Sequence, residues 1–268
     1  MLPYFEQPVL HLGPVPVYAF GVMVAIGIAV GIWLATRRAP LYGIDKEDLY
    51  DFIQWMLIPA FVISHVLDAA WYHPAELVEH PEMLLSIGGL SSFGGFLGAI
   101  VGAMAFRARR KVEILPFIDL TLSVFPIAWV FGRAGCTLAH DHPGIFTDAS
   151  NPLAFAYPDG PRWDLGFLEM LFSMLLSVAL VIWWRRARPI GFYVAATMIA
   201  YAPVRFALDF LREDATHGGD ARYLGLTPGQ WSAVAMLVGG IYFAVRARTA
   251  PLPTPAAPPP APATPPAG

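Results

Sequence analysis

Charged residues are scarce in this chain of 268 residues. Asp, Glu, Lys and Arg make up only 14% of it, whereas 56% is hydrophobic and the mean hydropathy is +0.54. A soluble domain carries about 25% charged residues. The shortage excludes an ordinary soluble domain, and nothing in the sequence indicates a nucleic-acid surface. We therefore expect an all-α membrane protein that crosses the bilayer several times.

Cysteine is almost absent, because Cys136 is the only one. A single cysteine excludes an intramolecular disulfide. The N-terminal segment MLPYFEQPVLHLGPVP also lacks the basic and apolar regions of a cleavable signal peptide. We therefore expect the first apolar segment to be retained as a membrane span.

Apolar segments long enough to cross a bilayer recur along the chain. A transmembrane helix needs about 20 mostly apolar residues. About seven segments qualify, namely 17–36, 50–71, 88–106, 114–134, 165–184, 190–211 and 228–245. They predict one polytopic transmembrane domain over residues 1–248. The remaining residues, 249–268, are uncharged and rich in proline, which predicts a disordered tail.

Basic residues predict the orientation of these spans. Of the 17 Lys and Arg residues, 12 lie in every second connection, at Arg37, Arg38, Lys46, Arg107, Arg109, Arg110, Lys111, Arg185, Arg186, Arg188, Arg246 and Arg248. Cytoplasmic loops carry such an excess of positive charge. The pattern predicts that the N-terminus lies outside and the C-terminus lies in the cytoplasm.

Ionisable residues inside the apolar segments are candidate functional groups, because they are costly in lipid. Arg205, Asp209 and Arg212 are spaced i, i+4 and i+7, so they share one helix face. They form either a self-neutralising structural pair or, since two arginines face one aspartate, a site with an unmatched positive charge for an anion. Glu169 lies early in the fifth predicted span, where it can pair with an arginine or remain at the interface.

A second polar cluster, VFGRAGCTLAHDHPG at 130–144, follows the fourth predicted span. Arg133, Cys136 and His140 are spaced i, i+3 and i+7, and Pro143-Gly144 predicts a turn that ends the helix. Cysteine, histidine and aspartate are zinc ligands by type, but the spacing here lacks the paired pattern of reliable zinc sites.

The segment IGGLSSFGGFLGAIVGA at 87–103 is rich in glycine. Small residues allow helices to pack closely. They also allow an unwound segment whose backbone N–H groups face an anion. Unwound backbone at this depth is tolerated where it lines a cavity. With arginines at the outer ends of two other spans, the second alternative predicts a site for a phosphate group such as a phospholipid headgroup, with contacts from Ser91, Gly94 and Gly95.

These motifs resemble the prolipoprotein diacylglyceryl transferases, bacterial inner-membrane enzymes. The resemblance covers about residues 8–248 and rests on the segments WLATRRA, GGLSSFGGFLGAIVG, GRAG, YAPVRFALDFLRED and TPGQ. It implies transfer of a diacylglyceryl group from phosphatidylglycerol to the lipobox cysteine of a prolipoprotein signal peptide, with a site towards the outer leaflet and no cofactor. It assigns the essential arginines to Arg133 and Arg205, which would hold the phosphate, and further substrate contacts are expected from Asp141, Glu169, Asp209 and Arg212.

The chain departs from the pattern that the resemblance implies. Cys136 and Ala139 replace asparagines, Asp141 replaces a glutamate, and Phe93 stands where a histidine proposed as the catalytic base is expected. One hypothesis is that His140 or His142 takes over as this base, since an unperturbed histidine is suited to it. The alternative is a divergent paralogue with another acceptor or no catalysis, with a metal held by Cys136, His140 and His142.

Overall fold

The structure, a computed structural model, describes residues 1–13, 15–85, 89–213 and 219–255. It divides into two compact units. The first unit comprises Met1–Arg37 and Ile118–Pro253, and the second comprises Arg38–Phe117 and Thr254–Gly268. Residues 256–268 of the predicted tail lie outside the described residues, so the tail and the domain boundary at 248 stay predictions.

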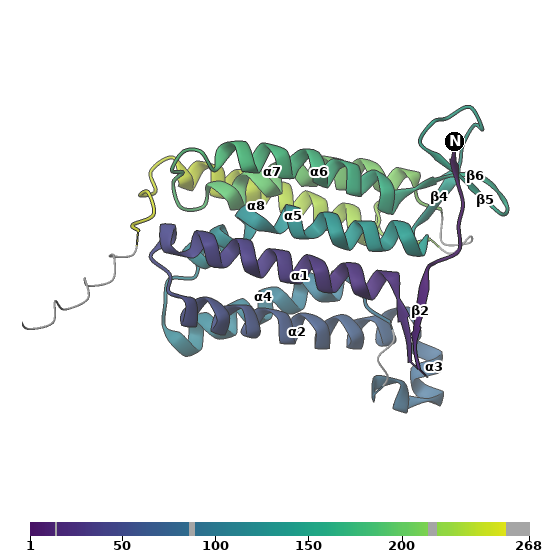
Figure 1. The fold of residues 1–268 in the computed structure, drawn as a ribbon, viewed down its shortest axis with the longest axis horizontal. Coiled ribbons are helices and arrows are strands. Elements are labelled where there is room, and N and C mark those ends of the chain that lie inside the picture. Colours follow the sequence, from purple (N-terminus) through teal and green to yellow (C-terminus); the bar gives the residue numbers. More distant parts are fainter. Residues whose placement is uncertain (14, 86–88, 214–218, 256–268) are drawn as a thin grey trace, which may run out of the picture. The chain divides into compact units, whose positions relative to one another are not determined.

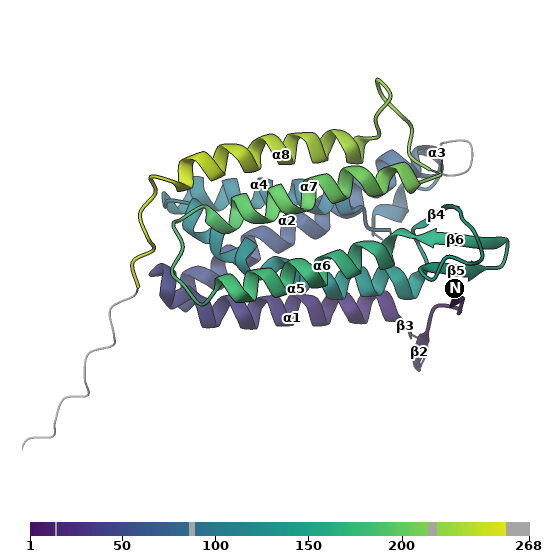
Figure 2. The same cartoon turned by 90° about the horizontal axis from the view of Figure 1, so that it is seen from above.

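The first unit contains the long helices that carry most of the polar cluster residues. They are α1 (Ala19–Arg38), α5 (Leu115–Ala139), α6 (Leu165–Trp183), α7 (Phe192–Leu208) and α8 (Pro228–Ala247). A short 3₁₀ turn, η3 (Asp209–Leu211), follows α7 directly. Figures 1 and 2 show α6 and α7 running alongside each other. The core between α5, α6 and α7 is built on Leu176, Leu180 and Tyr193.

The second unit is built around a pair of helices, α2 (Lys46–Tyr72) and α4 (Ser92–Arg110), which run side by side (Figure 1). It also holds the short helices η1 (Ala39–Tyr42), α3 (Pro74–Glu79) and η2 (Pro81–Leu85). The aromatic rings of Phe52, Phe106 and Phe117 pack against one another with centroids 5.2–5.4 Å apart. They form the core at the end of the unit where α4 finishes.

Six helices of the described chain are long and apolar enough to cross a membrane. They are Ala19–Tyr42, Lys46–Trp71, Leu115–Ala139, Leu165–Trp183, Phe192–Leu211 and Pro228–Ala247. They confirm the predicted all-α, multi-pass class. The remaining predicted span, 88–106, is also a helix from Ser92 onward, but it does not reach the same hydropathy, because it is rich in glycine and Arg107 follows its apolar part closely.

Glycines explain how α4 packs so closely on α2. Gly94, Gly98 and Gly102 lie one turn apart on one face, and a Cβ atom at Gly98 would fall 2.6 Å from the Cα atom of Ala60. The alternative of an unwound segment is therefore wrong for residues 92–103, which form a regular helix. Of the two sequence hypotheses, close packing between small residues is the one that the structure shows.

Small sheets lie outside the spans, and the sequence pattern did not predict them. β1 (Leu2–Pro3), β5 (Ala154–Tyr157), β6 (Gly160–Asp164) and β4 (Pro143–Phe146) form one sheet in that order, and β2 (Val9–Leu12) pairs with β3 (Val15–Tyr18). Pro143 and Gly144 thus belong to a strand, although the helix does end before them, at Ala139. In Figures 1 and 2, β4, β5, β6 and the N-terminus lie at the same end of the helices of the first unit.

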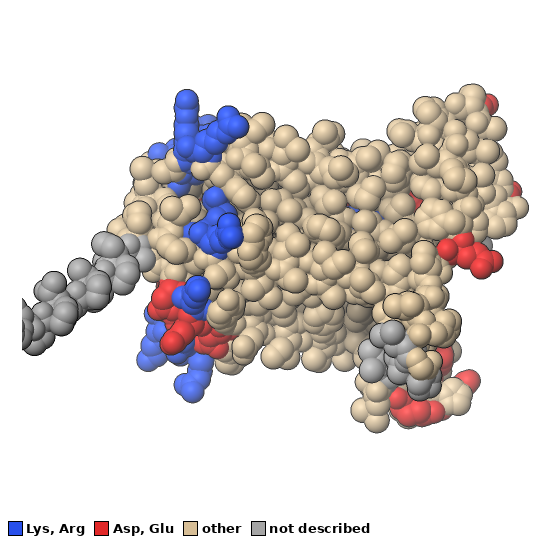
Figure 3. Space-filling view, in the orientation of Figure 1, with Lys and Arg blue, Asp and Glu red and all other residues tan. Residues whose placement is uncertain are grey.

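Charged side chains follow the division expected of membrane spans. Figure 3 shows basic side chains over the end of the first unit at which α6 and α8 finish, and hardly any charge along the middle of these helices. In the first unit, α1, α6 and α8 all finish at basic residues or just before them, and the strands lie at the other end of these helices.

Buried backbone groups at the start of α7 are satisfied by a distant carboxylate. Gly191 begins the helix in a left-handed conformation with φ of 93°. The Val194 N–H then donates to the fully buried Asp119 of α5 over 3.0 Å. Asp119 thereby caps α7 as a local N-cap residue would. This contact fixes the position of α7 along its axis relative to α5, and therefore also the position of Arg205.

The glycine face of α4 generates a prediction about stability. We expect Gly98→Ala to lower the stability of the protein by about 1–3 kcal/mol, because the new methyl group meets the backbone of α2 and the helices must separate. The measurement is thermal unfolding in detergent. Gly95→Ala is the matched control, since its Cβ meets only the Ser64 hydroxyl, 4.0 Å away. Equal stability of the two variants would contradict the proposed packing.

Candidate active site

Arg133 lies near the end of α5 and is 5% exposed. Its Nε lies 3.0 Å from the Glu169 carboxylate of α6, and the guanidinium stacks on the Trp129 ring, 4.6 Å from its centroid. Glu169 also accepts hydrogen bonds from Trp129 and from the hydroxyl of Tyr201 in α7. Three helices thus hold the arginine. Glu169, placed by the sequence either in a pair or at the interface, is buried and paired.

Cys136 lies one turn after Arg133 and is buried. Its Sγ lies 3.7 Å from Arg133 Nη1. The next residues of the cluster lie beyond the helix, where Asp141 and His142 return towards it. One ligand atom each from Cys136, Asp141 and His142 lies within 4.8 Å of the others.

The metal hypothesis named Cys136, His140 and His142. The structure brings Cys136 and His142 together, but with Asp141 in place of His140. Partial desolvation, opposed by Arg133, raises the pKa of the Asp141 carboxyl to about 6. Desolvation, with the positive charges of Arg133, Arg212 and Arg205, lowers the pKa of His142 to about 3, so its ring is neutral at neutral pH.

His140 is held apart from this group. It follows the last residue of α5 in a left-handed conformation with φ of 49°, which reverses the chain as a helix C-cap does. Its Nδ1 contacts Asp164 over 2.9 Å, and its ring is enclosed by Tyr4, Phe5, Phe155 and Tyr157 with centroids 4.6–5.3 Å away. The Nε2 atom is buried and has no hydrogen-bonding partner among the described residues.

Asp164 connects His140 to the start of α6. Its carboxylate accepts from the Phe167 N–H over 2.8 Å, and so caps the helix. It also accepts from the hydroxyl of Tyr157 over 2.9 Å. Burial, together with this carboxylate, raises the pKa of Tyr157 above its usual range. The four aromatic rings around His140 and the Asp164 cap together fix the direction of the chain that leads to Asp141 and His142.

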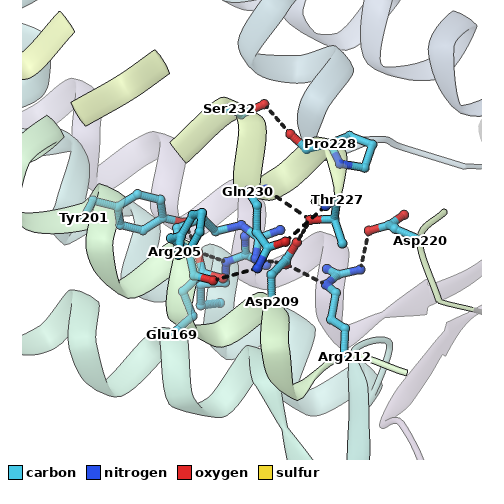
Figure 4. A network of polar contacts seen from close by, with 12 residues as sticks. Glu169, Tyr201, Arg205, Asp209, Arg212, Asp220, Thr227, Pro228, Gln230 and Ser232 are labelled. Carbon is cyan, nitrogen blue, oxygen red and sulfur yellow. Dashed lines mark hydrogen bonds and ion pairs between the residues drawn. The ribbon is translucent and has the colours of Figure 1, made fainter. Parts of the chain in front are cut away.

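Asp209 is the centre of the second polar group. It is fully buried, and it pairs with Arg205 and, over 3.1 Å, with Arg212 (Figure 4). The predicted contact between the three residues is confirmed. The expected unmatched positive charge is wrong, because Arg212 also pairs with Asp220 over 3.0 Å. Two arginines therefore face two aspartates, and the second one lies outside the motif from which the charge was counted.

The segment TPGQ at 227–230 supports Asp209 from α8. Thr227 and Gln230 form a capping box, in which Thr227 Oγ1 accepts from the Gln230 N–H over 3.0 Å and Gln230 Oε1 accepts from the Thr227 N–H over 3.1 Å. The Thr227 hydroxyl then donates to Asp209. A Cβ atom at Gly229 would fall 2.6 Å from Nη2 of Arg205, so glycine leaves room for the ion pair.

A small open pocket of about 90 Å³ lies beside these groups. It is lined by Asp141, His142, Pro143, Leu165, Arg212, Glu213 and Gly219. Arg162 of β6 bonds Glu213 of this lining and also, over 3.0 Å, the carbonyl oxygen of Gly144. A phosphate-sized group that enters the pocket meets Arg212 and His142.

The predicted contacts on α4 belong to the second unit. Ser91 is the N-cap of α4, and its side chain accepts from the Gly94 N–H, while its carbonyl oxygen accepts from the Gly95 N–H over 2.9 Å. These N–H groups are thus used within the first turn of the helix. Phe93 is 56% exposed. A role of Ser91, Gly94 and Gly95 in binding substrate stays a prediction.

Several residues of the site were not identified from the sequence. The sequence could have identified Thr227 and Gln230, since T-x-x-Q before an apolar run is the pattern of a capping box. Asp164 also had a local signal, as an N-cap residue before an apolar run, but its contacts with His140 and Tyr157 had none. Trp129 and Tyr201 had no signal, because each bonds Glu169 on another helix. Their importance follows only from the packing of the helices.

Comparison with known proteins shows which family this chain belongs to. The family model described as prolipoprotein diacylglyceryl transferase matches residues 7–246. The chain is also similar to curated proteins called phosphatidylglycerol–prolipoprotein diacylglyceryl transferase. That of Chromohalobacter salexigens is 27% identical over 93% of this chain and 95% of the relative, and that of Pseudoalteromonas atlantica is 29% identical over 91% and 89%.

The match covers both units and every residue of the two polar groups, from Arg133 to Gln230. It agrees with the multi-pass helical structure and with the resemblance drawn from the motifs. This chain is a member of the prolipoprotein diacylglyceryl transferase family.

Proposed function

We propose that this chain transfers the diacylglyceryl group of phosphatidylglycerol to the thiol of the lipobox cysteine in a prolipoprotein signal peptide. The observation that carries the proposal is a set of three arginines held by buried carboxylates next to the pocket. Arg133 pairs with Glu169, Arg205 and Arg212 both pair with Asp209, and Arg212 lines the pocket together with His142. The planar guanidinium group of one arginine can donate two parallel hydrogen bonds to two oxygens of a phosphate.

The reaction needs positive charge at the phosphate. The sulfur of the acceptor attacks the glyceryl carbon that carries the phosphate ester, a C–S bond forms, and the C–O bond breaks. The electron pair stays on the leaving oxygen of glycerol phosphate, which gains one negative charge, and the thiol gives up its proton. Arg133 and Arg205 are proposed to stabilise this charge, and fixed donors in a site shielded from water do so most effectively.

The carboxylates keep these arginines in place before substrate arrives. A guanidinium carries five N–H donors. Arg133 makes an ion pair with Glu169 through Nε, which donates no hydrogen bond, and its Nη1 donates to Cys136, while Arg205 donates to Asp209 through Nη1. The pairs therefore orient each fork without using all of its donors. Glu169 and Asp209 are accordingly proposed to position the arginines, with Arg212 and Asp141 at the entrance.

The two histidines are proposed to have different roles. His142 lines the pocket, so it can reach a bound acceptor. His140 is enclosed by aromatic rings and bound to Asp164, so we assign it the positioning of the turn that carries Asp141 and His142. This assignment replaces the hypothesis that either histidine serves equally as the base.

The site is proposed to face the outer leaflet of the bacterial inner membrane. In the first unit, the polar groups lie where α5 and α7 end and α6 and α8 begin, and Arg185, Arg186 and Arg246 lie at the opposite end of these helices. Basic residues mark the cytoplasmic side. The outer side is also where the headgroup of a lipid would meet Arg133 and Arg205.

The first prediction concerns the geometry of the arginines. Arg133→Lys and Arg205→Lys each keep the charge but lose the planar fork. We expect both to lower diacylglyceryl transfer by about 10²–10³-fold. The measurement is transfer of labelled diacylglyceryl from phosphatidylglycerol to a lipobox peptide by the purified chain. The control is Arg222→Lys, an exposed arginine. Unchanged transfer in both lysine variants, or none by the folded wild-type chain, would overturn the proposal.

The second prediction concerns the support from α8. Gly229→Ala places a methyl group against Arg205 and Asp209, so the arginine must move. Displacement of about 1 Å costs a reaction about 10²-fold, and we expect a loss of that order. Gly239→Ala in the same helix is the control, because its Cβ meets only the mobile end of Met198. A loss of helix content in Gly229→Ala, measured by circular dichroism, would assign the effect to folding instead.

A further inference from the structure

The last turn of α5 and the residues that follow it place three different metal-ligating groups together. The Cys136 thiol, the Asp141 carboxylate and the His142 imidazole lie within 4.8 Å of one another. The left-handed conformation of His140 makes this possible, because it turns the chain back onto the preceding helical turn.

The chemistry of these donors selects a particular kind of ion. One sulfur, one nitrogen and one oxygen suit zinc, whereas calcium and magnesium prefer oxygen alone. Zinc sites that take part in catalysis have three protein ligands and keep the fourth position for water or substrate. The group has this number of ligands, and two of them, Asp141 and His142, line the pocket.

The three ligand atoms need to move only a short distance towards one another to bind zinc. Tetrahedral zinc, with bonds of about 2.0–2.3 Å, holds its ligand atoms about 3.3–3.8 Å apart. The present spacing, up to 4.8 Å, must therefore shrink by about 1 Å. Cys136 is buried and fixed, but the side chains of Asp141 and His142 are 40% and 25% exposed and can move towards it.

Charge balance favours the ion despite the neighbouring arginine. Arg133 lies 3.7 Å from the Cys136 sulfur and would repel a cation. Its charge is matched by Glu169, 3.0 Å away. With a zinc ion bound, the thiolate of Cys136 and the carboxylate of Asp141 supply two more negative charges. Three anionic groups then balance Arg133 and one divalent ion, and the two other arginines near His142, Arg205 and Arg212, are matched by Asp209 and Asp220.

We propose that Cys136, Asp141 and His142 bind a zinc ion whose fourth position takes the thiol of the acceptor. This rests on the proposed function, in which a thiol is the nucleophile. A thiol that coordinates zinc is deprotonated, and its proton leaves to water. The bound sulfur attacks the glyceryl carbon, the C–O bond to phosphate breaks with its electrons on oxygen, and the uncharged thioether leaves the metal. The ion thereby takes the place of a general base.

The test measures metal and transfer in the same preparation. The full chain is purified through a tag free of histidine and cysteine, and its zinc is measured by mass spectrometry. We expect about one zinc per chain in the wild type and in His11→Ala, an exposed histidine on β2. Cys136→Ser and His142→Ala should lower zinc affinity at least tenfold. Cobalt replaces zinc as a probe, and its sulfur charge-transfer absorption must disappear in Cys136→Ser, since the chain has one cysteine.

The outcomes separate this inference from the proposed function. Stoichiometric zinc, loss of transfer on chelation and recovery with zinc support both. A wild-type chain that transfers diacylglyceryl but holds no more zinc than Cys136→Ser overturns the zinc site and leaves the function intact. Zinc that depends on Cys136 in a chain without transfer supports the site and overturns the function. If Cys136→Ser fails to fold, judged by its elution in detergent, His142→Ala takes its place in each of these comparisons.

Discussion

The pairing of arginines with buried carboxylates is the interaction on which the site depends. A charge in a membrane span is costly, and removing one partner of a buried pair leaves the other uncompensated. Glu169 and Asp209 are each nearly inaccessible to solvent, and each fixes an arginine on another turn or helix. Two further supports of the site, the Tyr201 hydroxyl and the capping box of α8, end on these two carboxylates.

This arrangement gives the site two linked halves. Arg133 and Glu169 join α5 to α6, while Asp209 joins the end of α7 to the start of α8. The helices are also held at their other ends, where Asp119 caps α7. Since helices are stiff, contacts at both ends determine where the side chains between them lie. The arginines proposed to bind phosphate are thus placed by the whole first unit rather than by a loop.

Much of the architecture could be predicted from the sequence because membrane spans leave strong signals. The spans, the arginines and the pairing of Arg205 with Asp209 followed from hydropathy and from helical spacing. The strands at 143–164 did not, because they are short and lie where hydropathy carries little information. The charge at Arg212 was misjudged for a related reason, since Asp220 reaches it from a separate segment that no periodicity connects to α7.

Local spacing was also a poor guide to the direction of side chains. Cys136 and His140 would share a face on a continued helix, but α5 ends at Ala139, and one left-handed residue sends His140 and His142 to different surroundings. Asp141, expected from the sequence as a replacement for a glutamate and as a substrate contact, lies next to Cys136. A single backbone dihedral angle therefore decides which groups can act together.

The parallel pairing of β1 with β5 has a consequence for how the protein is made. Leu2 pairs with Phe155, about 150 residues later in the chain, and contacts so distant in sequence form slowly. The N-terminal strand must wait until the residues after α5 have been synthesised and delivered to the same side of the membrane. Only then do Tyr4 and Phe5 close around His140. The aromatic residues around His140 therefore cannot assemble before the chain has been made as far as β5, however early α1 to α5 enter the membrane.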